Sequence, residues 1–186
     1  MKATHYFILA TSFLLSFAIE GVKGQHSEDF FRAAVEEETG AHIGLLAPEL
    51  ILESPSGEKI ALSSLRGQMV LIDFWAAWCP PCRRENPKLV NTYLQYKDEE
   101  FVNASGFTIY SVSLDKKVEN WTAAIEQDSL VWEAHVSDLK GRQSAAAVEY
   151  EVRAIPLNFL LDGDGIILAV GLRGSALEDR LKELLK

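Results

Sequence analysis

The sequence predicts an α/β protein in which one mixed central sheet is flanked by helices. Residues 68–76 are almost all apolar, which is typical of a central strand covered on both faces. Candidate strands and helices alternate along the chain after this segment. The chain has 186 residues, of which 48% are hydrophobic and 24% charged, so it has the length of one domain and enough apolar residues for a core.

The first 24 residues are expected to lie outside this fold. The apolar stretch at 6–19 follows a positively charged start and is shorter than the roughly 20 residues of a membrane span. It is typical of a secretory signal peptide, and we expect cleavage before Gln25. An uncleaved N-terminal anchor is the alternative. Residues 25–43 form an N-terminal extension with a possible helix at 27–39, and the domain occupies 44–186.

The domain begins with a predicted β-hairpin, because a turn cluster of Ser, Pro and Gly at 54–57 separates two short segments at 49–53 and 59–62. The strand at 68–76 then leads into a helix at 81–96, with a proline tolerated in its first turn.

In the second half of the chain, predicted strands and helices continue to alternate, and the domain ends with two strands and a helix. A tight turn at 162–165 joins the last two strands. Ser175 and Glu178 form a capping-box pair that predicts the start of the last helix. The remaining predicted elements are strands at 107–114, 157–161 and 166–171 and helices at 118–127 and 144–150.

Charge and composition exclude several functions. Lys and Arg number 18 against 27 Asp and Glu, which gives a net charge of −9. The chain has no basic run that could bind phosphates, so we expect no nucleic-acid partner. Two cysteines are too few for a disulfide-rich scaffold, and with four histidines we expect no metal site.

Both cysteines lie in Trp78-Cys79-Pro80-Pro81-Cys82, where the central strand ends and a helix begins. A helix N-terminus lowers the pKa of a thiol from about 8.5 to between roughly 3.5 and 7.5. Cys79, nearer the exposed loop, is then the attacking thiolate, and Cys82 resolves the mixed disulfide. A structural disulfide or half of a metal site are the alternatives. So small a loop gains little stability from a disulfide, and a metal needs more ligands.

The segment 73–82 resembles the active-site strand and loop of the thioredoxin superfamily, and the surrounding pattern resembles the exported TlpA and ResA-like thiol-disulfide oxidoreductases of bacteria. Supporting segments lie at 62–67, 85–87 and 155–162, and the resemblance covers residues 44 to 186. It implies a thioredoxin fold with an added N-terminal hairpin. It also implies a cis peptide before Pro156, beside the cysteine pair, whereas the local sequence alone fits an ordinary trans proline equally well.

Two acids are further candidates. Asp73 lies in the apolar strand, where burial would raise its pKa, and the resemblance implies that it relays protons when Cys82 attacks. The alternative is a structural Asp bonded to backbone. The resemblance also implies that Glu85 tunes the cysteines or recognises a partner, whereas a surface pair with Arg83 or Arg84 is the alternative. Thioredoxin supplies a lysine beside this Asp from the next strand, and residues 107–114 contain none.

The predicted site therefore has two groups of residues. Cys79, Cys82, Asp73 and Glu85 are the catalytic candidates. Trp78, Pro80, Pro81, Ile155 and Pro156 are the candidates for substrate binding. Trp75 and Trp78 also fit a packing role around the motif, and we expect His135 at the surface.

We expect a dithiol-disulfide oxidoreductase that reduces or exchanges disulfides of exported proteins, in the bacterial periplasm. No dissociable cofactor is needed, and a membrane or exported protein supplies electrons. Without a His between the cysteines, the pair favours a reductant with a potential below about −200 mV. A thiol peroxidase, which places a Thr where Ala76 lies, and a non-catalytic binding module of the same fold are the alternatives.

Overall fold

The computed structural model describes residues 39–186. The predicted signal at 1–24 and the possible helix at 27–39 lie outside the described residues, apart from Thr39. Within residues 39–186, no helix is long and apolar enough to traverse a bilayer.

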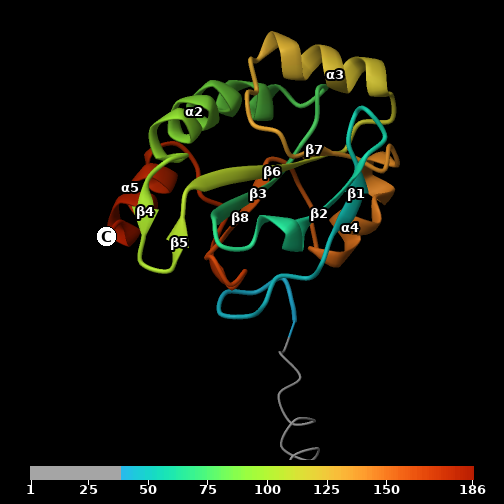
Figure 1. The fold of residues 1–186 in the computed structure, drawn as a ribbon. Helices are drawn as coiled ribbons and strands as arrows, with labels where there is room; N and C mark the ends of the chain where they lie inside the picture. Colours follow the sequence, from blue (N-terminus) through green and yellow to red (C-terminus); the bar gives the residue numbers. More distant parts are fainter. Residues whose placement is uncertain (1–38) are drawn as a thin grey trace, which may run out of the picture. The chain divides into compact units, whose positions relative to one another are not determined.

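The core is a five-stranded mixed sheet in the order β7-β6-β3-β8-β9 (Figure 1). The central strand β3 pairs in parallel with β6 and antiparallel with β8, so both of its edges are occupied. All seven residues of β3 are buried, as the apolar run predicts. The predicted mixed sheet is thus confirmed. The strands are β3 (Met69–Trp75), β6 (Phe107–Ser113), β7 (His135–Val136), β8 (Leu157–Leu161) and β9 (Ile167–Val170).

Helices cover both faces of the sheet. α2 (Pro80–Tyr96) and α5 (Ser175–Leu184) lie on one side, and α4 (Ala145–Glu149) lies on the other (Figure 1). The ring of Phe74 in β3 packs 5.5 Å from that of Tyr150, which follows α4. A further helix, α3 (Val118–Gln127), follows β6.

The predicted N-terminal hairpin is confirmed as β1 (Ile51–Glu53) and β2 (Lys59–Ala61), which pair antiparallel. Two buried tyrosines bind the hairpin region to the core. The hydroxyl of Tyr110 in β6 donates to the carbonyl of Ile60 at 2.9 Å, and that of Tyr150 donates to the carbonyl of Pro48 at 2.5 Å.

Residues 39–47 join the domain at the end of the sheet opposite the cysteines. Leu46 bridges Ile166, and the amide of Gly44 donates to the carbonyl of Ile167 at 2.8 Å. These contacts lie beside the end of β8, where Leu161 pairs with Val70 near the start of β3. The cysteine loop follows the other end of β3.

Short elements escaped the sequence analysis because they are only a few residues long: β4 (Glu100–Phe101), β5 (Ala104–Ser105), η1 (Leu62–Leu65), η2 (Gly141–Gln143) and β7. Strand β7 contains His135 and corrects the expectation that this residue lies at the surface. This residue pairs with Ser111 across β6 and β7, is 5% exposed, and stacks on Trp132 with ring centroids 5.4 Å apart. Its burial lowers the pKa of His135 to about 4.

The predicted capping box of α5 is wrong. Gly174 is the N-cap residue, Ser175 is already helical, and no side chain of the helix caps its start. The amide of Gly174 donates instead to the Glu85 carboxylate of α2 at 2.5 Å. A distant acid thus binds the amide of the residue that precedes the predicted Ser–Glu pair. Leu177 and Leu181 are the buried residues of this helix.

The hairpin contact gives a first prediction. Tyr110→Phe leaves buried carbonyl oxygens of the hairpin without their hydroxyl donor, so we expect the free energy of unfolding to fall by about 1–2 kcal/mol. Urea denaturation measures this loss. Tyr93→Phe is the matched control, because the Tyr93 side chain packs on Trp132 through its ring. An equal loss in the two variants would contradict the role of the Tyr110 hydroxyl.

Candidate active site

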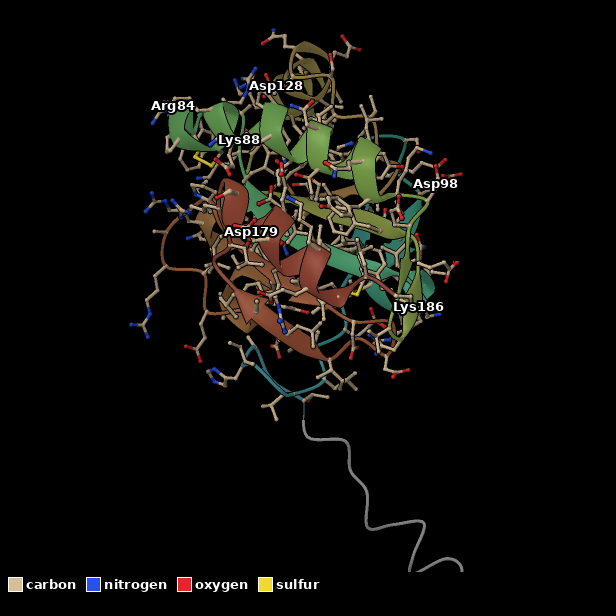
Figure 2. All side chains as sticks on the ribbon, turned by 90° about the vertical axis from the view of Figure 1, so that its left-hand side faces the viewer. Arg84, Lys88, Asp98, Asp128, Asp179 and Lys186 are labelled. Carbon is tan, nitrogen blue, oxygen red and sulfur yellow. A yellow bond between two sulfur atoms is a disulfide. The ribbon has the colours of Figure 1, made fainter. Side chains whose placement is uncertain are left out.

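The two cysteines form a disulfide across the first turn of α2, seen at the end of the helix that carries Arg84 (Figure 2). Cys79 is the N-cap residue, and its sulfur accepts a hydrogen bond from the amide of Cys82 at 3.2 Å. Both sulfurs therefore lie where the helix presents unpaired N–H groups, which stabilise a thiolate once the disulfide is reduced. Pro80 and Pro81 are exposed beside them.

The loop between β3 and α2 is held from three sides. The Asp115 carboxylate accepts from the amide of Ala77 at 2.9 Å. The indole N–H of Trp78 donates to the carbonyl of Leu114 at 3.3 Å, and Arg83 donates to the carbonyl of Ala77 at 3.3 Å. These bonds fix the residues that precede Cys79. Trp75 is fully buried in packing, whereas Trp78 is 50% exposed.

The start of α2 is also braced against the end of α3. The guanidinium of Arg83 binds both carboxylate oxygens of Asp128, with Nη2 to Oδ1 at 2.7 Å. Asn86 donates to the same carboxylate at 2.6 Å. Asp128 follows the last residue of α3, so this two-point contact orients the turn that carries the cysteines.

Asp73 is buried at the centre of the sheet, in register with Ser111 of β6 and Asn158 of β8. Burial, with the charge of Glu85 acting in the same direction, raises the pKa of Asp73 to about 7, and Arg173 opposes this shift. Ser111 occupies the place opposite Asp73 on the neighbouring strand, in the segment that contains no lysine. The cation that acts on Asp73 comes from the loop before α5.

Glu85 joins α2 to the start of α5. Its Oε1 accepts from the amide of Gly174, and its Oε2 forms an ion pair with Lys88 at 3.1 Å. The alternative pairing of Glu85 with Arg83 or Arg84 is therefore not the one formed. The Glu85 side chain is 16% exposed.

Pro156 lies at the cysteine end of the sheet. β8 starts at Leu157, which pairs with Phe74 near the end of β3, and Pro156 immediately precedes it. The Ile155–Pro156 peptide is cis, as the resemblance implies. Arg173 donates a hydrogen bond to the carbonyl of Pro156. Pro156 is buried, and Ile155 is partly exposed beside it.

The predicted site residues thus fall into three parts: the cysteine turn, the acids behind it, and the proline turn at the same end of the sheet. The sequence analysis missed Asp115, Asn158 and Arg173. A buried Asn in an apolar strand is a signal that could have identified Asn158, but Arg173 lies in a loop without any pattern. Within residues 39–186, no group of three or more His, Cys, Asp or Glu side chains could hold a metal ion.

Comparisons with known proteins agree with this architecture. The AhpC/TSA family model matches residues 43–170. Thioredoxin-like protein YneN of Bacillus subtilis is 32% identical over 139 residues, covering 75% of this chain and 76% of that protein. Thiol-disulfide oxidoreductase ResA of Bacillus cereus is 28% identical over 159 residues, covering 84% of each chain. The solved thioredoxin domain of a Bacteroides vulgatus thiol-disulfide oxidoreductase matches with TM-score 0.70 and 34% identity, covering 78% of this chain and 99% of that one.

The buried acid predicts a pH-dependent stability. Asp73 titrates near 7 in the native protein and near 3.9 when unfolded, so between these values the native state binds more protons. The free energy of unfolding of the wild-type protein therefore falls as pH rises through this range. Asp73→Asn has no carboxyl to ionise at this position, so the variant does not lose this free energy. We expect the variant's free energy of unfolding, relative to wild type, to increase by roughly 2–3 kcal/mol between pH 5 and pH 8.

Urea unfolding of the oxidised protein at the two pH values measures this difference. Asp128→Asn is the control, because it changes an Asp that is held by Arg83 near the surface rather than buried in the sheet. A difference between Asp73→Asn and wild type that is the same at pH 5 and pH 8 would show that Asp73 is ionised throughout.

Proposed function

We propose a function from one premise: the chain belongs to the AhpC/TSA family, with a cysteine pair at the helix start of its thioredoxin fold. It is a thiol-disulfide oxidoreductase. The observation that carries this conclusion is the position of Cys79 and Cys82 on the first turn of α2, at the end of the central strand. Here a dithiol and a disulfide can interconvert within a fixed backbone.

In the reaction we propose, the reduced protein donates two electrons to a client disulfide. The Cys79 thiolate attacks one client sulfur, a mixed disulfide forms, and the other client sulfur leaves as a thiolate. Cys82 then loses its proton and attacks the sulfur of Cys79. This step releases the second client thiol and leaves the Cys79–Cys82 disulfide. Cys79 is 3% exposed and Cys82 1% exposed in the oxidised protein. The half-exposed Trp78 before Cys79 and the gain of its thiolate from the helix dipole support the assignment of Cys79 as the attacking sulfur.

Asp73 is the proposed proton acceptor when Cys82 attacks. A carboxyl with a pKa of about 7 is partly ionised at neutral pH, so it can take up a proton and later release it. The same environment that makes Asp73 costly to ionise therefore suits it to this role. Glu85 is a positioning residue in this proposal, since its charge raises the pKa of Asp73 and its carboxylate holds the start of α5.

The clients we propose are exported proteins in the bacterial periplasm. The apolar stretch at 6–19, which follows a positively charged start, supports export through a signal peptide. The chain needs a donor that returns electrons to the Cys79–Cys82 disulfide after each cycle, and we propose a membrane or exported thiol reductase. Trp78, Pro80 and Pro81 surround the cysteines, and with Ile155 and Pro156 they form the proposed client contact.

The direction of exchange has its own test. The two residues between the cysteines are both Pro, without a His to hold the thiolate, so we expect a reductant with a potential below about −200 mV. Equilibration with glutathione buffers measures the potential. A value near −120 mV, typical of strongly oxidising dithiols, would contradict the proposed direction.

A further prediction concerns the roles of the two sulfurs. Cys82→Ser removes the resolving thiol, so client proteins are expected to accumulate as mixed disulfides on Cys79 that reductant releases. Non-reducing gels of cells that express the variant measure these adducts. Cys79→Ser is the matched control and should give few adducts, because its remaining thiol lies inside the helix turn. Equal trapping by the two variants would show that the roles of the sulfurs are assigned wrongly.

A further inference from the structure

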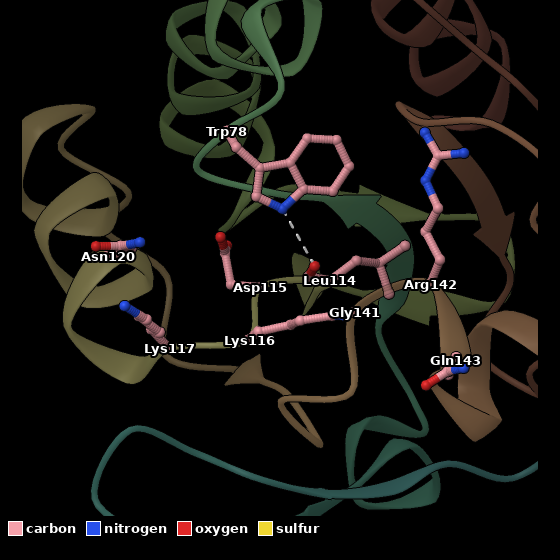
Figure 3. Close-up of a pocket in the computed structure, with 9 residues that line it drawn as sticks. All are labelled: Trp78, Leu114, Asp115, Lys116, Lys117, Asn120, Gly141, Arg142 and Gln143. Atoms are coloured by element: carbon pink, nitrogen blue, oxygen red, sulfur yellow. Dashed lines mark hydrogen bonds between the residues drawn. The ribbon is translucent and has the colours of Figure 1, made fainter.

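A pocket of about 460 Å³ opens beside the cysteine turn, next to Trp78 (Figure 3). Its walls come from four segments that the fold brings together: the loop before α2, the residues after β6, the start of α3, and η2. One wall is Trp78, the residue that immediately precedes Cys79, whereas neither cysteine lines the pocket itself. The lining residues are Trp78, Leu114, Asp115, Lys116, Lys117, Asn120, Gly141, Arg142 and Gln143.

The aromatic wall of this pocket is fixed in place. The indole N–H of Trp78 donates to the carbonyl of Leu114, and one ring face meets the guanidinium of Arg142, with Cζ 5.8 Å from the ring centroid. Trp78 is half exposed although it is held by these two contacts. A half-exposed indole that keeps one orientation is suited to binding, because little freedom is lost when a ligand packs against it.

The remaining walls carry a surplus of positive charge. Lys116, Lys117 and Arg142 line the pocket, and within residues 39–186 none of them forms an ion pair. The one carboxylate in the lining is that of Asp115. It is buried and accepts hydrogen bonds from the Ala77 amide and the Ser113 hydroxyl. Three cations therefore face one acid whose bonds are directed into the protein.

The backbone is shaped to seat one of these cations. Gly141 has φ of +61°, and a Cβ at this position would lie 2.8 Å from Cε of Lys116. Glycine thus lets the aliphatic stem of Lys116 lie against the backbone of η2. This basic pocket belongs to a chain whose net charge is −9, so its sign is opposite to that of the molecule as a whole.

We propose that the pocket binds the carboxylate of an Asp or Glu side chain in the client, close in sequence to the client disulfide. This inference rests on the proposed function and names its substrate class. A carboxylate forms charge-assisted hydrogen bonds with Lys and Arg, while the neighbouring client residue packs on Trp78. Because the protein is otherwise acidic, its remaining surface repels acidic client segments that do not enter this pocket. This repulsion increases the difference in affinity between clients that place a carboxylate in the pocket and clients that do not.

Two peptides that each contain one disulfide, and differ only in a Glu or Gln next to a cysteine, test the inference with the full-length chain. At low salt we expect kcat/KM for the Glu peptide to exceed that for the Gln peptide by about tenfold. Lys117→Gln and Arg142→Gln should each reduce this ratio by roughly threefold. Arg84→Gln is the matched control, because it removes one charge from the same end of α2 outside the pocket, and should leave the ratio unchanged.

A binding experiment on the oxidised protein keeps this inference separate from the proposed activity. Cysteine-free versions of the two peptides cannot exchange disulfides, so a shift of the Trp78 indole N–H in NMR spectra reports binding alone. The inference predicts that the Glu peptide shifts this resonance at lower concentration than the Gln peptide, and that Arg142→Gln makes this difference in concentration smaller. Equal shifts, no shift, or equal kcat/KM for two peptides that are both reduced would overturn the pocket assignment. Reduction of neither peptide, with selective binding intact, would overturn the proposed reductase instead.

Discussion

The burial of strand β3 is the constraint on which the site depends. Both of its edges are paired, both of its faces are covered, and every side chain from Met69 to Trp75 is buried. Because such a strand cannot shift without breaking two ladders, the loop that follows it has a fixed starting point. The same burial places Asp73 where ionisation is costly. One strand thus sets both the position of the cysteine turn and the acidity of the carboxyl behind it.

Contacts behind the cysteine turn join segments that are far apart in the chain. Glu85 on α2 binds the backbone before α5, and Arg173 from that same backbone binds the carbonyl of Pro156. Both charges act on Asp73, in opposite directions. The acidity of the buried carboxyl is therefore tied to the arrangement of α2, α5 and the proline turn. A movement of any one of these three elements therefore changes the electrostatic environment of Asp73.

The sequence predicted what depends on local pattern and missed what depends on distant partners. The apolar run of β3 and the cysteine spacing identified the sheet and the redox pair. The capping box was wrong although Ser175 and Glu178 fit a local rule, because the helix begins one residue earlier than a Ser175 cap requires. The acid that binds backbone at this helix start is Glu85, which the sequence does not place near it. His135 was expected at the surface because nothing in its sequence neighbourhood indicates that β7 lies against β6. Arg142 is likewise brought beside Lys116 and Lys117 only by the fold.

The entry of the chain into the domain has a consequence for orientation. Residues 39–47 contact the end of the sheet where β3 begins, and the strand then runs roughly 20 Å to the cysteine loop. Whatever is joined to Thr39 is therefore attached to the pole opposite the dithiol. The cysteines, the proline turn and the basic pocket all lie at the other pole of the domain. Attachment of the domain directly at residue 39 consequently leaves the redox face open to large partners, whereas attachment near the start of α2 would cover it.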